Sequence, residues 1–464
     1  MAIKQVQVEV DSLILGMYIA RLDRPWSQTP FALQGFYLRS PREIIQLQNY
    51  CQHVFIDIQK GRGPLDSVAP PVTSSQRKEV QYQPLGRSSA RIGAQAIKKN
   101  KEQTSSAPIV VRKGFYETRT GLRKEAAQAK KIVGRLKATL TLVVKQMARG
   151  RTVDYSRLKE SVGDMVESVL RCPDAFTWLI RLREQDERSY DHSLRSALWA
   201  VQFARYVGMP QDEIDVLCMG TLLKDIGKAK LSNRLLRKEH RSEAEEKEFR
   251  KHVTYGVDLL RQTHQIEPRV ISVVRYQAER NDGSGYPEGL AGGKIPLLAR
   301  IAGIASTYDK ICFSPDGSDP LAPSRAVSVL YGMRDKQFSD DLVVSFIQSI
   351  GLYPAGTLVE LTTGDIGVVT EQHPKSRLTP KVAVLGREDT DLSAAVIVID
   401  LKNDEKTRDA LGANKEKGSF DRVAIARDLE PGGYDVDLSK IAHLFITKEL
   451  GGSKGFFSSW LKRH

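Results

Sequence analysis

The chain has 464 residues, of which 41% are hydrophobic and 27% charged, and it carries 70 Lys and Arg against 56 Asp and Glu. This composition is that of a globular protein and excludes a disordered or fibrous chain. No apolar run approaches the roughly 18 residues that are needed to span a bilayer, and the first residues are charged where a secretion signal would be apolar. We therefore expect a cytoplasmic protein. Four scattered cysteines without a C-x-x-C pair argue against a zinc module or a disulfide framework.

Residues 1–60 predict a small α+β domain, which we interpret as the input domain that senses a signal. Short β-prone runs at 6–10, 14–19 and 53–58 alternate with one helical stretch at 41–50. Residues 61–120 follow as a basic linker, and much of this range is rich in Gly, Pro, Ser and Gln, a composition that favours flexibility.

A long basic amphipathic helix is predicted over 121–150, where apolar residues recur at steps of three and four: Val133, Leu136, Leu140, Val143 and Met147. Residues 61–150 hold 19 basic and 5 acidic residues, and the rest of the chain balances at 51 of each. This excess of positive charge is typical of a surface that binds nucleic acid, an anionic membrane or an acidic partner. We favour a solvated linker followed by a packed helix, because no aromatic residues interleave with the charges as base stacking requires. The apolar stripe is short for a homodimer seam, which stays an alternative.

Residues 151–352 read as nearly continuous amphipathic helix and predict the largest domain. Over 353–464 the period first drops to two, which predicts a small β module followed by a tail. The expected fold class is therefore mostly α, with a small N-terminal α+β domain and a small C-terminal β module.

The residues that could carry chemistry all lie in the predicted helical domain. Lys224, Asp225 and Lys228 stand at the end of an apolar helix, which we expect Gly227 to break so that the flanking polar side chains are exposed. His252 follows, and then a polar, glycine-rich loop with a distinctive sequence: Asp282, Gly283, Ser284, Gly285, Tyr286 and Pro287. A motif this long is far more specific than an isolated glycine triplet.

At these residues the sequence resembles the HD-GYP family of bacterial cyclic di-GMP phosphodiesterases, a subgroup of the HD metallohydrolases, over about residues 185–350. The run 353–370 resembles the usual tail of such domains, and the chain up to about residue 130 resembles the uncharacterised domain that often precedes them. The resemblance implies an HD-superfamily helical fold. It also implies a cluster of iron or manganese ions that activates a water for attack on a phosphodiester.

The family's metal-ligand positions can be followed one by one. The retained ligands are His192, Asp225 and His252, and the lysine that follows the H-D pair is retained as Lys228. The His of the H-D pair is Lys224, the later His-His pair is Gln277 and Ala278, and the last metal-binding Asp is Ser306. Four of the seven ligand positions are therefore replaced.

These replacements predict that the metal cluster is lost and that no cofactor is bound. A lysine ammonium has no lone pair to offer a metal, and it repels a divalent ion. In one alternative His192, Asp225 and His252 still hold a single iron or manganese ion, with Asp225 and Lys228 as residual catalytic residues. In the favoured alternative Lys224 pairs with Asp225 and leaves both histidines neutral and hydrogen-bonded.

Two binding roles remain open. Lys228, Arg275 and Arg280 could bind a dianionic nucleotide such as cyclic di-GMP, because arginine matches phosphate oxygens in a bidentate way; alternatively Arg280 only braces the loop that follows it. The loop from Asp282 to Pro287 is polar and exposed in the prediction, as a partner-binding loop would be. The family resemblance implies a GGDEF-type diguanylate cyclase as its partner, with another signalling protein as the alternative.

The sequence thus predicts a degenerate HD-GYP protein, a pseudo-enzyme that acts as a non-hydrolytic regulator in cyclic di-GMP signalling through protein contact or nucleotide binding. The first alternative is an active metal-dependent cyclic di-GMP phosphodiesterase with a reduced metal site. The second is a nucleic-acid or membrane-surface binder that uses residues 61–150, with nucleic acid the less expected ligand.

Overall fold

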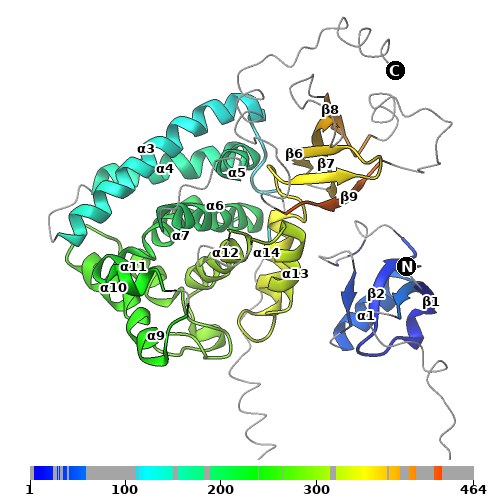
Figure 1. Cartoon of the computed structure of the whole chain (residues 1–464), viewed down its shortest axis with the longest axis horizontal. Helices are drawn as coiled ribbons and strands as arrows, with labels where there is room; N and C mark the ends of the chain where they lie inside the picture. The colour runs from blue at the N-terminus through cyan, green and yellow to red at the C-terminus, as the bar shows by residue number, and fades with distance from the viewer. Residues whose placement is uncertain are drawn as a thin grey trace, which may run out of the picture. The chain divides into compact units, whose positions relative to one another are not determined.

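The computed structural model consists of two compact units, Met1–Glu102 and Gln103–His464 (Figure 1). The described residues are 5–24, 29, 31, 35–38, 41–58, 111–112, 114–149, 155–181, 189–238, 240–263, 265–313, 320–373, 376–386, 397–403 and 423–430. The predicted linker lies outside the described residues over 61–110, and so does the end of the chain from residue 431.

The first unit is a four-stranded antiparallel sheet with one helix. The strands are β1 (Gln5–Glu9), β2 (Tyr18–Leu22), β3 (Phe36–Tyr37) and β4 (His53–Asp57), in the order β1-β4-β2-β3, and η1 (Val10–Ser12) and α1 (Pro41–Tyr50) accompany them. Val54 and Ile56 of the central strand β4 are fully buried, whereas Phe55 between them contacts the guanidinium of Arg21. This alternation is that of a strand with one face on a core.

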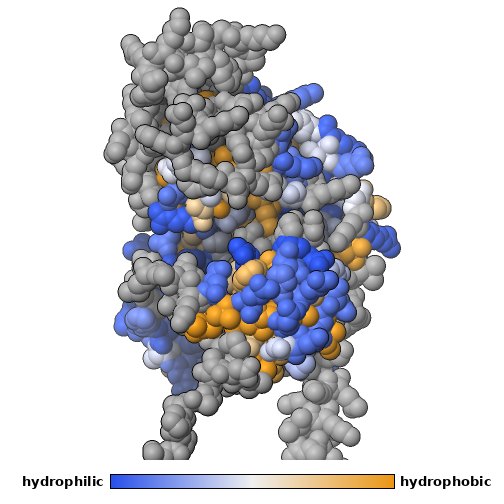
Figure 2. Space-filling model, turned by 90° about the vertical axis from the view of Figure 1, so that its right-hand side faces the viewer, coloured by the Kyte–Doolittle hydropathy of each residue, from blue (hydrophilic) through white to orange (hydrophobic). Residues whose placement is uncertain are grey.

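Large apolar side chains also reach the surface of the first unit: Leu15, Tyr37, Ile45 and Tyr50. In the space-filling view, hydrophobic residues gather at the surface beside hydrophilic ones (Figure 2). Apolar residues that are exposed beside polar ones are common on protein surfaces.

The second unit is built mainly from helices. Those before the motif residues are α3 (Leu122–Ala148), α4 (Tyr155–Arg171), α5 (Pro173–Arg181), α6 (Ser189–Val207) and α7 (Gln211–Leu223). The remaining helical segments are η4 (Ile226–Lys230), α8 (Asn233–Leu236), α9 (Glu243–Arg250), α10 (His252–Arg261), α11 (Pro268–Tyr276), η5 (Gly292–Lys294), α12 (Leu297–Phe313), α13 (Pro323–Tyr331) and α14 (Asp340–Ile350). Among the described residues, none of the helices is long and apolar enough to cross a bilayer.

The core of this unit lies where α6 packs against α7 and α12. Trp199 of α6 makes an edge-to-face contact with Tyr308 of α12, with ring centroids 5.3 Å apart, and Phe346 of α14 contacts Tyr308 and Phe203 at 5.6 Å. All four rings are fully buried, and such contacts add to the energy of burial. This cluster fixes the relative positions of α6 and α12, which both carry motif residues.

A five-stranded antiparallel sheet completes the second unit. Its strands are β5 (Leu358–Leu361), β6 (Ile366–His373), β7 (Ser376–Gly386), β8 (Ile397–Asp400) and β9 (Ile425–Asp428), in the order β8-β7-β6-β5-β9. The carboxylate of Asp428 in β9 accepts hydrogen bonds from the backbone and hydroxyl of Ser324, which ties the sheet to the start of α13. The mostly helical fold class with two small strand-containing parts is confirmed.

Candidate functional site

The motif residues meet where α7 ends and η4 begins. Lys224 caps α7, Asp225 precedes η4, and Gly227 lies in η4. A Cβ atom on Gly227 would lie 1.9 Å from the carbonyl oxygen of His252 and 2.4 Å from the backbone nitrogen of Gly256. Only glycine therefore allows η4 to pack directly on α10, and this close approach brings Asp225 beside His252.

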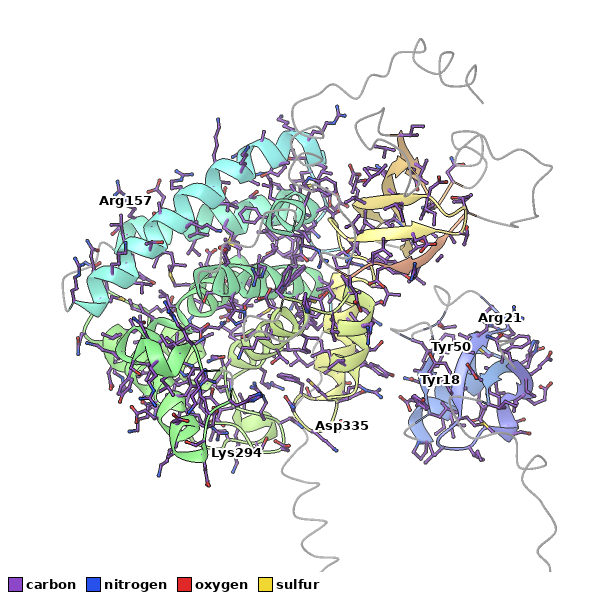
Figure 3. The ribbon with its side chains drawn as sticks, viewed as in Figure 1. Tyr18, Arg21, Tyr50, Arg157, Lys294 and Asp335 are labelled. Atoms are coloured by element: carbon purple, nitrogen blue, oxygen red, sulfur yellow. The ribbon has the colours of Figure 1, made fainter. Side chains whose placement is uncertain are left out.

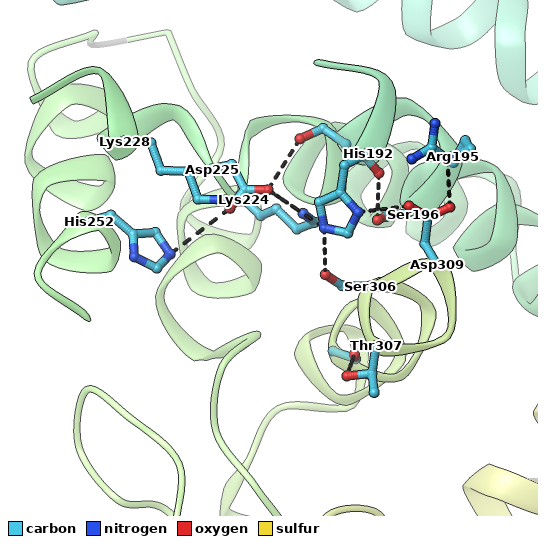
Figure 4. Close-up of polar contacts among 12 residues, drawn as sticks. His192, Arg195, Ser196, Lys224, Asp225, Lys228, His252, Ser306, Thr307 and Asp309 are labelled. Carbon is cyan, nitrogen blue, oxygen red and sulfur yellow. Dashed lines mark hydrogen bonds and ion pairs between the residues drawn. The ribbon is translucent and has the colours of Figure 1, made fainter. Parts of the chain in front are cut away.

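The carboxylate of Asp225 is the centre of the cluster (Figure 4). The ammonium of Lys224 bonds Oδ2 of Asp225, and Nζ of Lys228 lies 2.9 Å from Oδ1. The Nε2 atom of His192 is 3.9 Å from Oδ2, and that of His252 is 3.9 Å from Oδ1. The structure thus brings the predicted residues of three separate segments together around one carboxylate.

The side chain of Lys224 is only 1% exposed. The expectation that the helix break would expose the polar residues beside Gly227 is therefore wrong for this lysine. It is buried because its ammonium meets a carboxylate inside the domain, the usual requirement for a buried charge.

Both histidines of the cluster present Nε2 to Asp225. Nδ1 of His192 lies 2.7 Å from Oδ2 of Asp309, and Nδ1 of His252 lies 2.7 Å from the carbonyl oxygen of Phe249. Since both partners are acceptors, each neutral ring donates through Nδ1 and carries its lone pair on Nε2. Arg195 and Trp199 in turn hold Asp309 through its Oδ1, at 2.9 and 3.2 Å.

The electrostatics of the cluster follow from burial and the two lysines. Burial lowers the pKa of Lys224 to about 8, although Asp225 opposes the shift. Burial would raise the pKa of Asp225, but Lys224 and Lys228 bring it well below its ordinary value. Burial also lowers the pKa of His192 and His252 to about 4, assisted by Lys224 and Lys228 respectively. Near neutral pH the cluster therefore contains an ionised aspartate, two ammonium groups and two neutral imidazoles.

A metal cluster does not fit this arrangement. Both oxygens of Asp225 contact ammonium groups, and the hydroxyl of Ser306 lies 3.2 Å from Nε2 of His192, where it donates to the lone pair a metal would need. Gln277 and Ala278 are buried and supply no imidazole or carboxylate. Among the described residues, no three His, Cys, Asp or Glu side chains come together in a way that could hold a metal ion. His192, Asp225 and His252 are neighbours without forming such a group.

The three cations considered for nucleotide binding each have a partner of their own. Lys228 bonds Asp225, and Nε of Arg275 donates to Oε1 of Glu288 at 2.7 Å. Arg280 donates to the carbonyl oxygens of Gln277 and Glu279 and lies over the ring of Phe338. The contacts of Arg280 are those expected of a residue that braces the following loop, and each of the three cations is engaged with a group of the chain itself.

Glu279 anchors the chain directly after the loop Asp282–Pro287. Its carboxylate accepts hydrogen bonds from the backbone of Glu288 at 2.7 Å and of Leu290 at 2.9 Å. Asp282 fixes Ser284 through that residue's backbone and hydroxyl. A Cβ on Gly285 would lie 2.3 Å from the backbone nitrogen of Arg280, so this position also requires glycine. The loop is thus held by hydrogen bonds and close packing, with Asp282, Ser284 and Pro287 exposed.

The loop also reaches the cluster. The ring of Tyr286 makes an edge contact with His252, with centroids 6.2 Å apart, and the guanidinium of Arg250 lies 5.0 Å from the centre of the Tyr286 ring. Sequence reasoning missed the inner support by Glu279. Its position directly before Arg280 and the glycine-rich loop is the only signal that the sequence offers.

A second missed feature is the contact of α3 with the cluster's scaffold. Lys137 of α3 forms an ion pair with Asp191, the residue before His192 on α6, and α3 also contacts η4. The helix that follows the predicted linker therefore touches the elements that carry both His192 and Asp225.

Comparison with known proteins identifies two domains. The profile of a domain of unknown function, DUF3391, matches residues 5–158, and that of the HD domain matches residues 179–342. A cyclic di-GMP phosphodiesterase of Pseudomonas aeruginosa is 28% identical over 85% of this chain and 88% of its own length.

Other relatives align with about a third of this chain. A 3'3'-cGAMP-specific phosphodiesterase of Vibrio cholerae is 31% identical over 33% of this chain and 30% of its own length. A cyclic di-GMP phosphodiesterase response regulator of Xanthomonas campestris is 30% identical over 31% of this chain and 39% of its own. This chain thus spans less than half of the length of these two relatives.

Among solved structures, an HD-GYP-type protein of Bdellovibrio bacteriovorus is 15% identical and aligns with 74% of this chain and 98% of its own, with a TM-score of 0.43. The range matched by the HD profile contains the cluster and the loop. The chain therefore carries a DUF3391 domain followed by an HD domain, and it is similar to a cyclic di-GMP phosphodiesterase over most of its length, in agreement with the resemblance to the HD-GYP family.

Proposed function

We propose that this chain is a non-hydrolytic regulator in cyclic di-GMP signalling. The pathway is supported by the relatives named as cyclic di-GMP phosphodiesterases. The absence of hydrolysis is supported by one observation above all, the buried ammonium of Lys224 on the carboxylate of Asp225. That lysine stands where the family has the histidine of its H-D pair.

Lys224 replaces the metal's charge without replacing its chemistry. An ammonium neutralises the carboxylate and keeps the buried cluster intact, but it cannot ligate a water or lower its pKa as a metal ion does. A divalent ion bound to Asp225 would also be repelled by Lys224 and Lys228, whose ammonium groups contact the same carboxylate. The neutral histidines then serve the fold through Asp309 and Phe249.

We further propose that regulation proceeds by protein contact through the loop Asp282–Pro287. The loop is exposed and internally fixed, which reduces the ordering cost of binding a partner. The cations that would bind a nucleotide are engaged within the chain instead. The family resemblance supports a GGDEF-type diguanylate cyclase as the partner.

Metal content and turnover test the loss of hydrolysis. We expect the purified full-length chain to contain no stoichiometric iron or manganese by elemental analysis and to leave cyclic di-GMP intact with either ion added. A fully active HD-GYP enzyme in the same buffers is the control for the assay. Stoichiometric metal together with linear product formation would show an active phosphodiesterase with a reduced metal site.

A restored variant tests whether the replaced ligands are the cause. Lys224→His, Gln277→His, Ala278→His and Ser306→Asp together return the family's ligands, and we expect this variant to bind iron or manganese. Lys224→His alone should not, because the other three ligands are still missing. Equal metal uptake by the unaltered chain would contradict the role given to Lys224.

Binding measurements separate the two modes of regulation. Calorimetric titration with cyclic di-GMP should give no heat of binding if protein contact is the mode. Ser284→Arg, on the exposed loop, should abolish binding of a purified GGDEF-domain partner, whereas Ser156→Arg, exposed on α4, should not. Tight binding of the nucleotide with no effect of Ser284→Arg would favour the nucleotide mode.

A further inference from the structure

The helix α3 has two sharply different faces. It is 27 residues long, and its apolar face packs against α4 and α5. Its other face carries the exposed basic side chains Lys124, Lys130, Lys131, Arg135, Lys145 and Arg149, the last at the helix C-cap. Below, this set is called the basic face of α3.

The basic face forms a line along the helix. With about 100° of rotation per residue, Lys124, Lys131, Leu142 and Arg149 fall within about 20° of one another. The first and last of them are about 37 Å apart along the axis. The charges are therefore arranged to contact a long, straight surface rather than a single point.

Most of these charges are not neutralised inside the described part of the chain. The only acidic residue of α3, Glu125, is buried and bonds Ser168 at 2.6 Å and Arg171 at 2.9 Å. Arg135 pairs with Asp164 at 2.7 Å. Lys124, Lys130, Lys131, Lys145 and Arg149 form no ion pair among the described residues. An external anionic surface would supply the missing counter-charges.

We propose that the basic face of α3 docks on an anionic lipid bilayer. Leu142, 51% exposed, lies in the same line as the cations and can enter the interfacial layer. The residues between the cations include Ala127, Gly134 and Ala138, which are exposed and too small to hold the helix away from a flat surface. Figure 1 shows α3 along the outer edge of the helical part of its unit, where such a surface can approach.

The composition of the face favours lipid over the other polyanions. Four of its six cations are lysines, which act as point charges, whereas recognition of single phosphates or carboxylates favours the bidentate fork of arginine. The helix contains no aromatic residue on which a base could stack. This inference goes beyond the proposed function and does not depend on it, because it uses no residue of the cluster or the loop.

Vesicle sedimentation with the full-length chain tests the inference. We expect binding to phosphatidylcholine vesicles that contain about 30% phosphatidylserine and none to phosphatidylcholine alone. The variant K124E/K131E/K145E/R149E should bind at least about 100-fold more weakly, since each basic residue near an anionic surface contributes roughly fivefold. Binding should also weaken as salt rises from about 0.05 to 0.5 M.

A matched variant controls for net charge. Lys247, Lys294, Lys336 and Lys402 are exposed outside α3, and Figure 3 shows Lys294 at the far end of the helical part from Arg157, which lies beside α3 on α4. K247E/K294E/K336E/K402E changes the net charge equally and should retain vesicle binding to within about threefold. Equal melting temperatures of the two variants show that both are folded.

Three outcomes would overturn the inference. The first is no binding of the unaltered chain to the anionic vesicles. The second is an equal loss in both variants, which would reduce the effect to net charge. The third is binding of a DNA or RNA duplex, lost in the α3 variant, with no binding of vesicles, which would assign the basic face to nucleic acid.

Discussion

Two carboxylates of the second unit, Asp225 and Asp174, show what a buried acid requires. Asp225 contacts the ammonium groups of Lys224 and Lys228, and its pKa lies well below the ordinary value. Asp174, in the first turn of α5, accepts a hydrogen bond from the backbone of Gln372 at 3.0 Å, and burial raises its pKa to about 6.

Asp174 does not lack nearby positive charge. Arg377 and Arg205 both lower its pKa, but neither guanidinium bonds it. Nη1 of Arg377 donates to the carbonyl oxygen of Ser349 and the side chain of Gln372, and Nε of Arg205 donates to the carbonyl oxygen of Leu170. Direct contact with a cation, rather than its presence in the neighbourhood, therefore brings the pKa of a buried acid below its ordinary value.

The largest expected effect comes from removing the carboxylate that holds the lysines. Asp225→Asn leaves the ammonium of Lys224 buried without a counter-charge and should lower the free energy of unfolding by about 3–5 kcal/mol. Urea unfolding measures the loss. Asp258→Asn, an exposed carboxylate on α10, is the matched control and should change stability by less than about 0.5 kcal/mol. A similar small change at Asp225 would show that the pair is only tolerated.

The next effect is a pH dependence at the same cluster. His252 has a pKa of about 4 in the fold against 6.5 as its ordinary value, so the unfolded chain binds more protons in that window. Its contribution to stability is present above pH 6.5 and is lost as the pH falls to about 4, by up to about 3 kcal/mol.

His252→Asn, which can still donate to the carbonyl of Phe249, should remove that part of the slope. Urea unfolding at pH 7 and pH 4.5 checks this, and His192 should supply a similar slope in both proteins. The same pH slope in His252→Asn and the unaltered chain would mean that His252 is not buried as a neutral ring.

Asp174 should show the opposite pH dependence. Its pKa is raised from 3.8 to about 6, so its contribution to stability is fully present below about pH 4 and is lost as the pH rises through 6. Asp174→Asn keeps an acceptor for the Gln372 backbone and should stabilise the chain by about 1 kcal/mol at pH 7, a value reduced for the partial exposure of the side chain. At pH 4 the two proteins should unfold at the same urea concentration. Destabilisation by Asn at pH 7 would mean that the nearby arginines fully offset the cost of burying the Asp174 carboxylate.

The smallest effect concerns a partly exposed ion pair beside the cluster. Lys137→Gln removes the partner of Asp191 and should cost about 0.5–1 kcal/mol, because solvent screens such pairs. The cost should disappear in the Asp191→Asn background, which a double-mutant cycle measures. An undiminished cost there would place the contribution of Lys137 in its packing on α6 instead.

The sequence predicts the cluster better than it predicts the supports of the cluster. The motif predicted that four residues lie close together, because the corresponding positions of the resembled family line one cavity. These residues are His192, Asp225, His252 and Ser306. Asp309 had a usable signal, since it lies one helical turn after Ser306 and so shares its face of α12.

Other contacts cannot be predicted from the types of the residues that make them. The hydrogen bond that Asp174 accepts comes from a backbone N–H some 200 residues away, which any residue except proline would offer at position 372. The burial of Lys224 is equally hidden, because lysines are rarely buried and the local pattern favours exposure. Such features depend on the tertiary fold alone.

The position of α3 has an evolutionary consequence. The HD profile begins at residue 179, yet α3 and α4 pack on α5, and α4 also packs on α6 and α7. Met165 and Val166 of α4 are fully buried in these contacts. Recombination at residue 179 would strip this cover and leave an apolar face to aggregate, whereas exchange between residues 58 and 111 would leave it intact. The chain boundary that keeps this cover intact therefore lies before α3, ahead of the start of the HD profile.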